Sequence, residues 1–340
     1  MFYRIPANLP SEIAELEGQI ASFQAGTLDA GALKARRVPF GCYEQRKDGA
    51  FMLRIRATGG AITPAQLAAI ARAAIQFGSG FIHITTREEF QIHDLALGDV
   101  IAAMRALLAA GLSTRGGGGN TVRNIMVSPG AGIDRDEVFD PSPCAFALTT
   151  RLIAEGDSWL MPRKLKITFS NSPADTAFAQ FNDLGFIACL RDGERGFRVY
   201  VAGGFGGKPS VGHLLHDFIP VADVYRVAEA VKRLFYKHGN RKNRNAARLR
   251  FLWSSLGEER FRELYEEERR ALEKEDVAPF VVEDTPTEVQ TPPAPSGGGE
   301  DPAFSAWRER FVTPQRPELS LIHISAPPRL ARMAGGGLGV

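Results

Sequence analysis

The sequence predicts an α+β fold in which helices cover one face of a small sheet. Between residues 51 and 110 the hydrophobic pattern changes in the order strand, helix, strand, strand, helix. Glycines at 59, 60, 78, 80 and 111 separate these elements. A content of 44% hydrophobic and 24% charged residues over 340 positions is typical of a folded protein with a substantial core.

Local signals define the elements of this first unit. Thr63 and Pro64 predict a helix start, because a threonine hydroxyl caps free amides and proline suits the first helical position. The other elements that we predict here are strands Phe51–Arg56, Phe81–Thr85 and Glu89–His93, helices Pro64–Phe77 and Leu97–Ala110, and an upstream helix Ser11–Gln24.

A second group of elements follows four consecutive glycines, Gly116–Gly119. We predict a helix near Cys144–Glu155, strands at Lys164–Ser170, Phe186–Leu190 and Phe197–Val201, and helices from Val221 to Lys274 with a break near Gly239. The proline- and glycine-rich composition from Glu283 to Pro302 is typical of a linker. The chain is therefore divided into an N-terminal extension (1–40), two α+β domains (41–113 and 114–278), a linker (279–302) and the beginning of a further unit (303–340).

The charge balance and the N-terminus exclude several classes of protein. With 41 basic and 39 acidic side chains, the formal charge of +2 argues against a general nucleic-acid or membrane-surface binder. No stretch reaches the roughly 20 continuous apolar residues that a membrane span needs. The N-terminal MFYRIPANLPSEIAELEG turns acidic where a signal peptide is apolar, so we expect a cytoplasmic protein. The three widely spaced cysteines exclude a disulfide scaffold and a CxxC metal site.

Two predicted strands each carry a pair of cations on one face. Arg54 and Arg56 form the first pair, and Lys164 and Lys166, directly after Arg163, form the second. One interpretation is that both faces are solvated. The other is a pocket for a multiply charged anion, because buried cations need anionic partners and no neighbouring run of carboxylates supplies them.

Two glycine-rich stretches lie close to further polar residues. In GGGGNTVRNI the glycines let main-chain amides approach an anion, and Asn120, Arg123 and Asn124 add side-chain donors. A flexible loop tip is the simpler alternative. The stretch GGFGGK (Gly203–Lys208) lacks the spacing of a P-loop, and a plain turn is its simpler interpretation.

Other polar residues carry weaker signals. Arg87 lies between two predicted strands, with Thr85 and Gln91 as candidate hydrogen-bonding neighbours. His83 and His93 lie on these strands, where a structural role is favoured over metal ligation. His213 and His216 are expected to meet on a helix face, but they lack an acidic or cysteine partner for a metal.

A basic stretch, Asn240–Arg250, leaves a nucleic-acid alternative open. We predict Arg241, Arg244 and Arg248 on one helical face, from which they would bind RNA or another polyanion. Interleaved aromatic residues are absent and the acidic stretch Glu258–Glu275 follows, so charge compensation within the protein is favoured.

Taken together, the segments resemble the N-terminal half of the siroheme-dependent nitrite and sulfite reductases. The matching stretches cover about residues 38–257, in the order of the family: FMLRIRATGGAIT, FIHITTREEFQIHDL, GGGGNTVRNI, PRKLKITFS with DLGFIACL, GFRVYVAGGFGGKPSVG and GNRKNRNAARLRFL. The resemblance implies a ferredoxin-like α/β sandwich unit followed by a siroheme-reductase α+β domain, with siroheme held between two such halves. It also implies a six-electron reduction of sulfite to sulfide or of nitrite to ammonia.

The resemblance also implies roles for individual residues. Arg54, Arg123, Lys164 and Lys166 resemble the catalytic cations that surround the substrate anion, stabilise developing oxyanions and deliver protons. The carboxylates of siroheme explain why so many cations lack acidic partners. The positions that resemble siroheme-binding ones are Arg56, Thr85, Arg87, Gln91, Asn120, Asn124, Gly203, Gly204, Gly206 and Gly207.

Substrate and electron donor are less well defined. Lysine at both positions of Lys164-Leu165-Lys166 favours sulfite, because many nitrite reductases of the family have asparagine at the second position. The expected electron donor is ferredoxin or a flavoprotein, and we expect no nucleic-acid or membrane partner.

The cysteines depart from the family pattern. The family holds a [4Fe–4S] cluster on four cysteines of its C-terminal half, whereas Cys42, Cys144 and Cys189 lack that spacing. The resemblance stops near Leu321, and the SLIHIS that follows looks like out-of-frame or adapter-derived sequence. We therefore expect a fragment of a longer reductase with little or no turnover alone. The alternative is a non-enzymatic tetrapyrrole-binding half that pairs with a separate cysteine-bearing chain.

Overall fold

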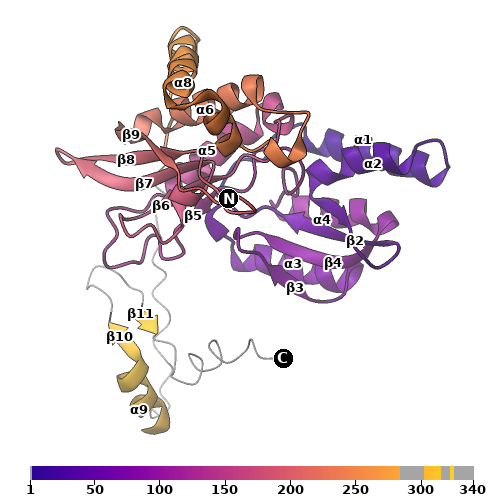
Figure 1. The fold of residues 1–340 in the computed structure, drawn as a ribbon. Helices are drawn as coiled ribbons and strands as arrows, with labels where there is room; N and C mark the ends of the chain where they lie inside the picture. Colours follow the sequence, from indigo (N-terminus) through magenta and orange to yellow (C-terminus); the bar gives the residue numbers. More distant parts are fainter. Residues whose placement is uncertain (1, 284–301, 315–321, 325–340) are drawn as a thin grey trace. The chain divides into compact units, whose positions relative to one another are not determined.

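The first sheet is built from the segment in which the sequence predicts alternating strands and helices. In the computed structural model, which describes residues 2–283, 302–314 and 322–324, this sheet is antiparallel throughout (Figure 1). Its spatial order is β1 (Cys42–Glu44), β2 (Ala50–Ile55), β4 (Phe90–Ala96) and β3 (Ile82–Ile84).

Two helices, α3 (Pro64–Phe77) and α4 (Val100–Ala109), share one hydrophobic core with this sheet. The predicted start of α3 is confirmed: the Thr63 hydroxyl accepts from the Gln66 main-chain amide at 3.1 Å, and the Gln66 side chain accepts from the Thr63 amide at 3.1 Å. This reciprocal capping satisfies two helix-terminal amides. The mixed α+β class and the β-α-β-β-α order that we predicted are therefore both present.

The N-terminal residues join the same core. Helix α1 (Leu9–Gln24) buries Leu9, Ile13, Leu16 and Ile20, which recur at the helical spacing of three and four. A short helix that we did not predict, α2 (Ala30–Arg37), begins at Asp29, whose carboxylate caps the amides of Gly31 and Ala32.

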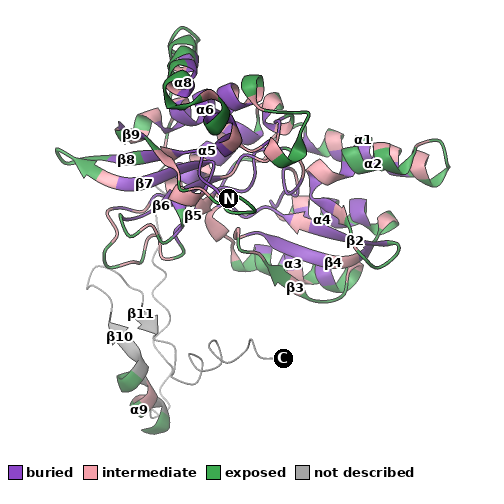
Figure 2. Ribbon diagram, viewed as in Figure 1, coloured by how far each residue is buried: buried purple, intermediate pink, exposed green. Residues whose placement is uncertain are grey.

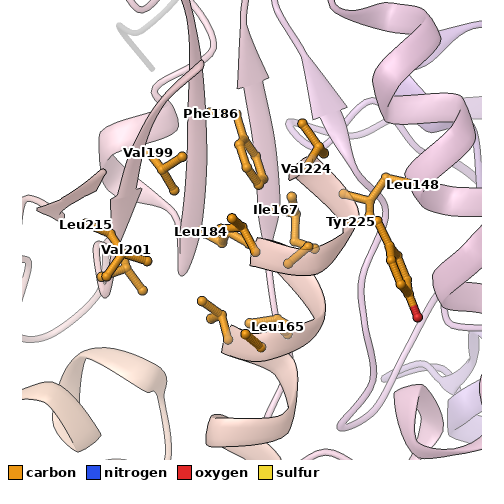
Figure 3. Packing of buried hydrophobic residues seen from close by; sticks show 14 of the residues in the cluster. Leu148, Leu165, Ile167, Leu184, Phe186, Val199, Val201, Leu215, Val224 and Tyr225 are labelled. Atoms are coloured by element: carbon orange, nitrogen blue, oxygen red, sulfur yellow. The ribbon is translucent and has the colours of Figure 1, made fainter. Parts of the chain in front are cut away.

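The second sheet is mixed and lies on a larger core. Its order is β5 (Met126–Val127), β6 (Ile167–Ser170), β7 (Leu184–Arg191), β8 (Glu194–Val201) and β9 (His213–Pro220), with the first two pairs parallel and the last two antiparallel. The helices of this part are α5 (Ser142–Ile153), α6 (Val224–His238), α7 (Leu249–Leu256) and α8 (Glu258–Glu273). Their buried faces and those of the strands make up one cluster (Figures 2 and 3).

Three local predictions were wrong. His213 and His216 lie on strand β9, not on a helix; the buried Leu215 and Ile219 are four residues apart, a spacing that a helix and an irregular strand both produce. The strand predicted from Lys164 begins only at Ile167. Residues 240–248 form turns and a short 3₁₀ helix, Arg244–Ala246, instead of an α-helix, because the side chains of Asn240 and Asn243 accept nearby main-chain amides.

The chain divides into two units, and the elements above belong to the first, residues 1–132 and 138–283. The second unit comprises residues 133–137 and 284–340. Its described elements are helix α9 (Pro302–Phe311) and an antiparallel pair, β10 (Val312–Pro314) with β11 (Ile322–Ile324). Most of the predicted linker and of the C-terminal segment lies outside the described residues. No helix within the described ranges is long and apolar enough to cross a membrane.

The aromatic centre of the second core gives a prediction about stability. Phe186 is fully buried and stacks on Phe169 with ring centroids 4.6 Å apart. We expect Phe186→Ala to lower the free energy of unfolding by about 3–5 kcal/mol, since it leaves a cavity in a packed core. Urea denaturation followed by circular dichroism measures this. The control is Leu190→Ala on the same strand, where the side chain is 55% exposed; an equal loss in both variants would contradict the prediction.

Candidate anion-binding site

Two arginines, the partly buried Arg54 and the buried Arg123, converge on one main-chain carbonyl. Arg54 on β2 donates to the Gly117 oxygen at 2.9 Å, and Arg123 donates to the same oxygen at 2.6 Å. Both guanidinium groups also lie near Glu89 Oε2, at 3.8 and 3.9 Å. Gly117 belongs to the glycine loop, residues 116–119, so the sequence-distant arginines are brought together by the loop predicted to approach an anion.

Arg56 supports this loop from inside the fold. Its guanidinium is 1% exposed and donates to the main-chain oxygens of Arg115, Val122 and Arg123 at 3.3, 3.0 and 3.3 Å. A Cβ at Gly116, where φ is +78°, would lie 2.2 Å from Arg56 Nη2. Only glycine suits this position.

Arg54 and Arg56 both reach the glycine loop: Arg54 donates to the Gly117 oxygen, and Arg56 Nη2 lies against Gly116. Strand β2 ends at Ile55, and Arg56 continues into a bridge with Ser113. This geometry favours a role for Arg56 in holding the loop over direct contact with a ligand.

The two lysines lie beside Arg123. The Arg123 amide donates to the Leu165 oxygen at 2.9 Å, which fixes the extended segment containing Lys164 and Lys166. Both side chains are partly buried. Burial, followed by the neighbouring Arg248 and Arg123, lowers the pKa of Lys164 to about 8. Burial, followed by Arg87 and Arg248, lowers the pKa of Lys166 to about 7. Part of their charge is thus lost near neutral pH unless an anion is present.

Arg87 joins the two sheets. It lies in the turn between β3 and β4 and donates to Asn182 Oδ1 at 2.9 Å, to the Asn124 oxygen at 2.6 Å and to the Ile167 oxygen at 3.3 Å. The Thr85 hydroxyl shapes this turn by accepting the amides of Arg87 and Glu89. The structure therefore places Thr85 as support for Arg87.

Asn124 and Gln91 are buried around the same arginines. The Asn124 amide nitrogen donates to the oxygens of Ala57 and Arg87 at 2.7 and 3.0 Å. Gln91 pairs with Arg54 across β4 and β2. In the amide orientation that satisfies both groups, the Gln91 oxygen accepts from Arg54 Nη2 at 2.8 Å. Asn120 is separate: it is exposed and accepts from Arg163 at 3.3 Å.

The second glycine stretch meets two arginines that the sequence analysis did not single out as ligands. A Cβ at Gly204 would lie 2.8 Å from Arg250 Nη1. Gly203 and Gly204 are buried, whereas Gly206 and Gly207 are exposed. Arg248 makes a bidentate contact with the fully buried Asp183, with its Nη2 2.9 and 2.8 Å from the two carboxylate oxygens. The sequence signal that we missed is the spacing of Arg248 and Arg250. They lie two residues apart, as do Arg54 with Arg56 and Lys164 with Lys166.

A cavity of about 980 Å³ opens next to these cations. It shares Asn120, Arg123 and Lys164 with the predicted site, and its wall adds Lys34, Arg163, Arg241 and Arg244. Arg54, Gln91 and Lys166 do not line it, so the cavity borders the site without enclosing all of it.

Several buried polar atoms at this site lack a partner within the described residues. They are Arg87 Nε, Glu89 Oε1, Arg123 Nε, Asn124 Oδ1, and Arg250 Nε and Nη1. Native proteins satisfy most such atoms, and here most of the unsatisfied groups are guanidinium donors. Cations outnumber the neighbouring carboxylates, Glu89 and Asp183. This donor set fits an anionic ligand with several carboxylates or oxyanion oxygens.

The cysteines do not fit a metal cluster. Cys42 belongs to the first core and Cys144 to the second, while Cys189 lies on β7. In the described part of the chain, no group of three or more His, Cys, Asp or Glu side chains is placed to hold a metal ion.

Fold and site together define an α+β protein with a cluster of partly buried cations, and the comparisons identify its family. The model for the nitrite/sulfite reductase ferredoxin-like half domain matches residues 43–110, and the model for the nitrite and sulphite reductase 4Fe-4S domain matches residues 118–272. This chain belongs to the nitrite and sulfite reductase family.

Curated relatives include both kinds of reductase. The chain is 34% identical over 249 residues to the assimilatory ferredoxin-dependent nitrite reductase of Haloferax mediterranei, covering 67% of this chain and 42% of the relative. It is 32% identical over 260 residues to a ferredoxin sulfite reductase of Mycolicibacterium paratuberculosis, covering 71% of this chain and 46% of the relative. The chain thus spans less than half the length of either relative.

Solved structures agree with the fold. The NirA protein of Mycobacterium tuberculosis superposes with a TM-score of 0.69 at 28% identity, covering 79% of this chain and 54% of that one. A dissimilatory sulfite reductase I superposes with a TM-score of 0.58 at 14% identity, which supports the fold alone.

The lowered lysine pKa values predict how stability depends on pH. Because the pKa of Lys166 is about 7 in the folded state and 10.5 in an exposed lysine, the unfolded state binds more protons between these values. The free energy of unfolding should therefore rise with pH across this window. We expect Lys166→Met to raise it by roughly 1–3 kcal/mol at pH 6.5, with most of the gain lost near pH 10.

Urea denaturation across this pH range tests the expectation. The control is Lys208→Met, in an exposed position on the nearby glycine stretch. A gain for Lys166→Met that stayed the same at both pH values would show that packing, not charge, is responsible.

Proposed function

We propose that this chain supplies the cationic wall of a siroheme-dependent reductase site that takes sulfite or nitrite. The observation that carries the proposal is the convergence of Arg54 and Arg123 on the Gly117 oxygen, with Lys164 near Arg123 and buried guanidinium donors left unsatisfied. Family membership supports the reaction class, and the surplus of cations over carboxylates supports a polycarboxylate cofactor.

The protein residues have distinct roles in this proposal. Arg54 and Arg123, held by the Gly117 oxygen, bind the substrate anion and stabilise the charge that develops on oxygen as S–O or N–O bonds break. Lys164 and Lys166 donate protons to the departing oxygens, because a pKa near 7 to 8 lets a lysine give up its proton at neutral pH. Siroheme, when bound, supplies the redox chemistry.

Further polar residues hold siroheme in this proposal. Arg87, Asn124 and Arg250 carry buried atoms without a partner, and Gln91 is paired with Arg54 across the strands. Gly203 and Gly204 bring main chain close to the same region. Thr85 and Arg56 act indirectly, by fixing Arg87 and the glycine loop.

Substrate and electron donor are further parts of the proposal. Relatives named as nitrite reductases and as sulfite reductases match about equally well. We favour sulfite, with lysine at both 164 and 166 as the supporting feature, and ferredoxin as the donor, since both relatives are named as ferredoxin enzymes.

The cysteines set a condition on turnover. The whole sequence has three, fewer than a four-cysteine cluster needs. In this proposal the 340 residues alone bind cofactor and anion with little or no turnover, and full reduction requires cysteines from elsewhere. Reduction of sulfite or nitrite to completion by the purified chain would overturn this point.

Titration with siroheme tests the site. We expect the purified chain to bind siroheme, with an absorbance change that saturates at one equivalent. Arg123→Met should weaken binding roughly 10- to 100-fold, as expected for the loss of hydrogen bonds to a charged group worth about 1.5–3 kcal/mol. The control is Arg72→Met on the exposed face of α3. Failure of the unaltered chain to bind siroheme, or equal weakening by both substitutions, would refute the proposed site.

A further inference from the structure

A row of side chains in close polar contact leads from Arg54 on β2 along β4 to Gln45, just after β1. Gln91 on β4 is paired with Arg54 on β2 and with His83 on β3. His93 lies two residues beyond Gln91, on the same face of the strand. Gln45, just after β1, completes the row.

The contacts along this row are continuous. The Asp94 amide donates to Gln45 Oε1 at 2.7 Å, and Gln45 Nε2 lies 3.3 Å from His93 Nδ1. On the other side of the ring, His93 Nε2 lies 3.2 Å from the Gln91 amide, whose other end lies 2.8 Å from Arg54 Nη2. Each residue of the row thus contacts the next through one side-chain atom.

Donors exceed acceptors in this row. Both ends only donate: the Asp94 main-chain N–H at one end and the Arg54 guanidinium at the other. Between them, each glutamine amide offers one accepting end and a neutral imidazole offers one accepting nitrogen. Four contacts therefore share three acceptors, and one contact always brings two donors together.

His93 must be neutral if only one contact of the row is to lack an acceptor. Protonation would remove the single acceptor of the ring and create a second contact between donors. Burial, followed by the neighbouring His83, lowers the pKa of His93, and Arg54 lowers it further. Asp94 acts in the opposite sense, but its carboxylate lies 3.7 Å from Lys47 Nζ.

The two tautomers of His93 place the unmatched contact at different points of the row. With the proton on His93 Nδ1, the ring accepts from Gln91, the Gln91 oxygen accepts from Arg54, and the unmatched contact faces Gln45. With the proton on Nε2, the ring accepts from Gln45 and donates to the Gln91 oxygen. The Gln91 NH2 group then faces the Arg54 guanidinium, and an anionic oxygen bound there would accept from both.

We propose that His93 is a positioning residue for the anion site: its tautomer turns the Gln91 amide between Arg54 and a bound anionic oxygen. The proton is on Nδ1 in the free chain and on Nε2 when a carboxylate or oxyanion oxygen lies beside Arg54. The inference rests on the proposed function in one respect, that an anion binds at Arg54. In this proposal the Gln91 NH2 group is an adjustable donor. It faces His93 in the free protein and faces the anion beside Arg54 when an anion is bound.

Nitrogen NMR of the full chain, labelled with ¹⁵N-histidine, reports the tautomer directly. The His93 signals are assigned by their loss in His93→Gln. We expect the Nδ1–H tautomer in the free chain and the Nε2–H tautomer with saturating sulfite. Sirohydrochlorin, the iron-free macrocycle, serves as a second probe, and the ligand that changes the tautomer shows whether a substrate oxygen or a cofactor carboxylate occupies the position.

Binding affinities provide the second test. His93→Phe removes both ring nitrogens and leaves the Gln91 oxygen on Arg54, so we expect calorimetry to show affinity for the anion reduced roughly 3- to 10-fold. His93→Gln keeps one donor and one acceptor and should restore most of it. The control is His83→Phe, whose ring touches His93 edge-on with centroids 5.9 Å apart.

The outcomes separate the two claims. An Nε2–H tautomer in the free chain, or an unchanged tautomer while either probe binds, overturns the role of His93. Equal losses in the two phenylalanine variants also overturn it. If neither probe binds, the proposed function fails, and the tautomer of the free chain still decides whether the row is arranged as inferred.

Discussion

The Gly117 carbonyl is the point on which the site depends. Arg54 comes from the first sheet and Arg123 from the beginning of the second, and this one oxygen accepts from both. Two guanidinium groups normally repel each other at such proximity. A shared carbonyl, a nearby buried carboxylate and a loop held by a third arginine make the arrangement tolerable. The positions of the two guanidinium groups are therefore set by the main chain of the glycine loop and not by a flexible side chain.

The cation-rich site is supported by a fold that is otherwise conventional. Each sheet has its own hydrophobic core, and the charged residues gather where loops of both sheets meet. Concentrating positive charge in a partly buried place lowers stability, and the large cores on either side offset this. Such a balance is common at functional sites, where complementarity to a ligand is gained at the expense of the free protein.

Much of this could be predicted from the sequence, because the informative signals were local. The start of α3 at Thr63-Pro64 and the order of strands and helices from Ala50 to Ala109 needed only periodicity and capping. Segments whose pattern suits two structures were harder. Strand β9 carries apolar residues at a spacing that also suits a helix. Residues 240–248 carry charges at a helical spacing, but the side chains of Asn240 and Asn243 accept hydrogen bonds from main-chain amides there.

The residue types of the site could be predicted from the sequence, but their arrangement in space could not. Cations without acidic neighbours predicted an anion site; Arg54 and Arg123 share the Gly117 oxygen, and Lys164 lies near Arg123. Sequence could not show that Arg56 is buried and donates to main-chain oxygens, since its acceptors come from a distant part of the chain. Nor could it show Arg248 and Arg250 meeting the second glycine stretch, because such contacts arise only from the tertiary packing of distant segments.

The two lysines give the site a property beyond charge. An anion that settles between Lys164 and Lys166 raises their affinity for protons, so binding near neutral pH draws protons from solution. In the proposed reduction, these protons are part of the acid that is consumed when bonds to oxygen break. Anion binding and proton uptake would then occur together, so the heat measured for binding would depend on the buffer that supplies the protons.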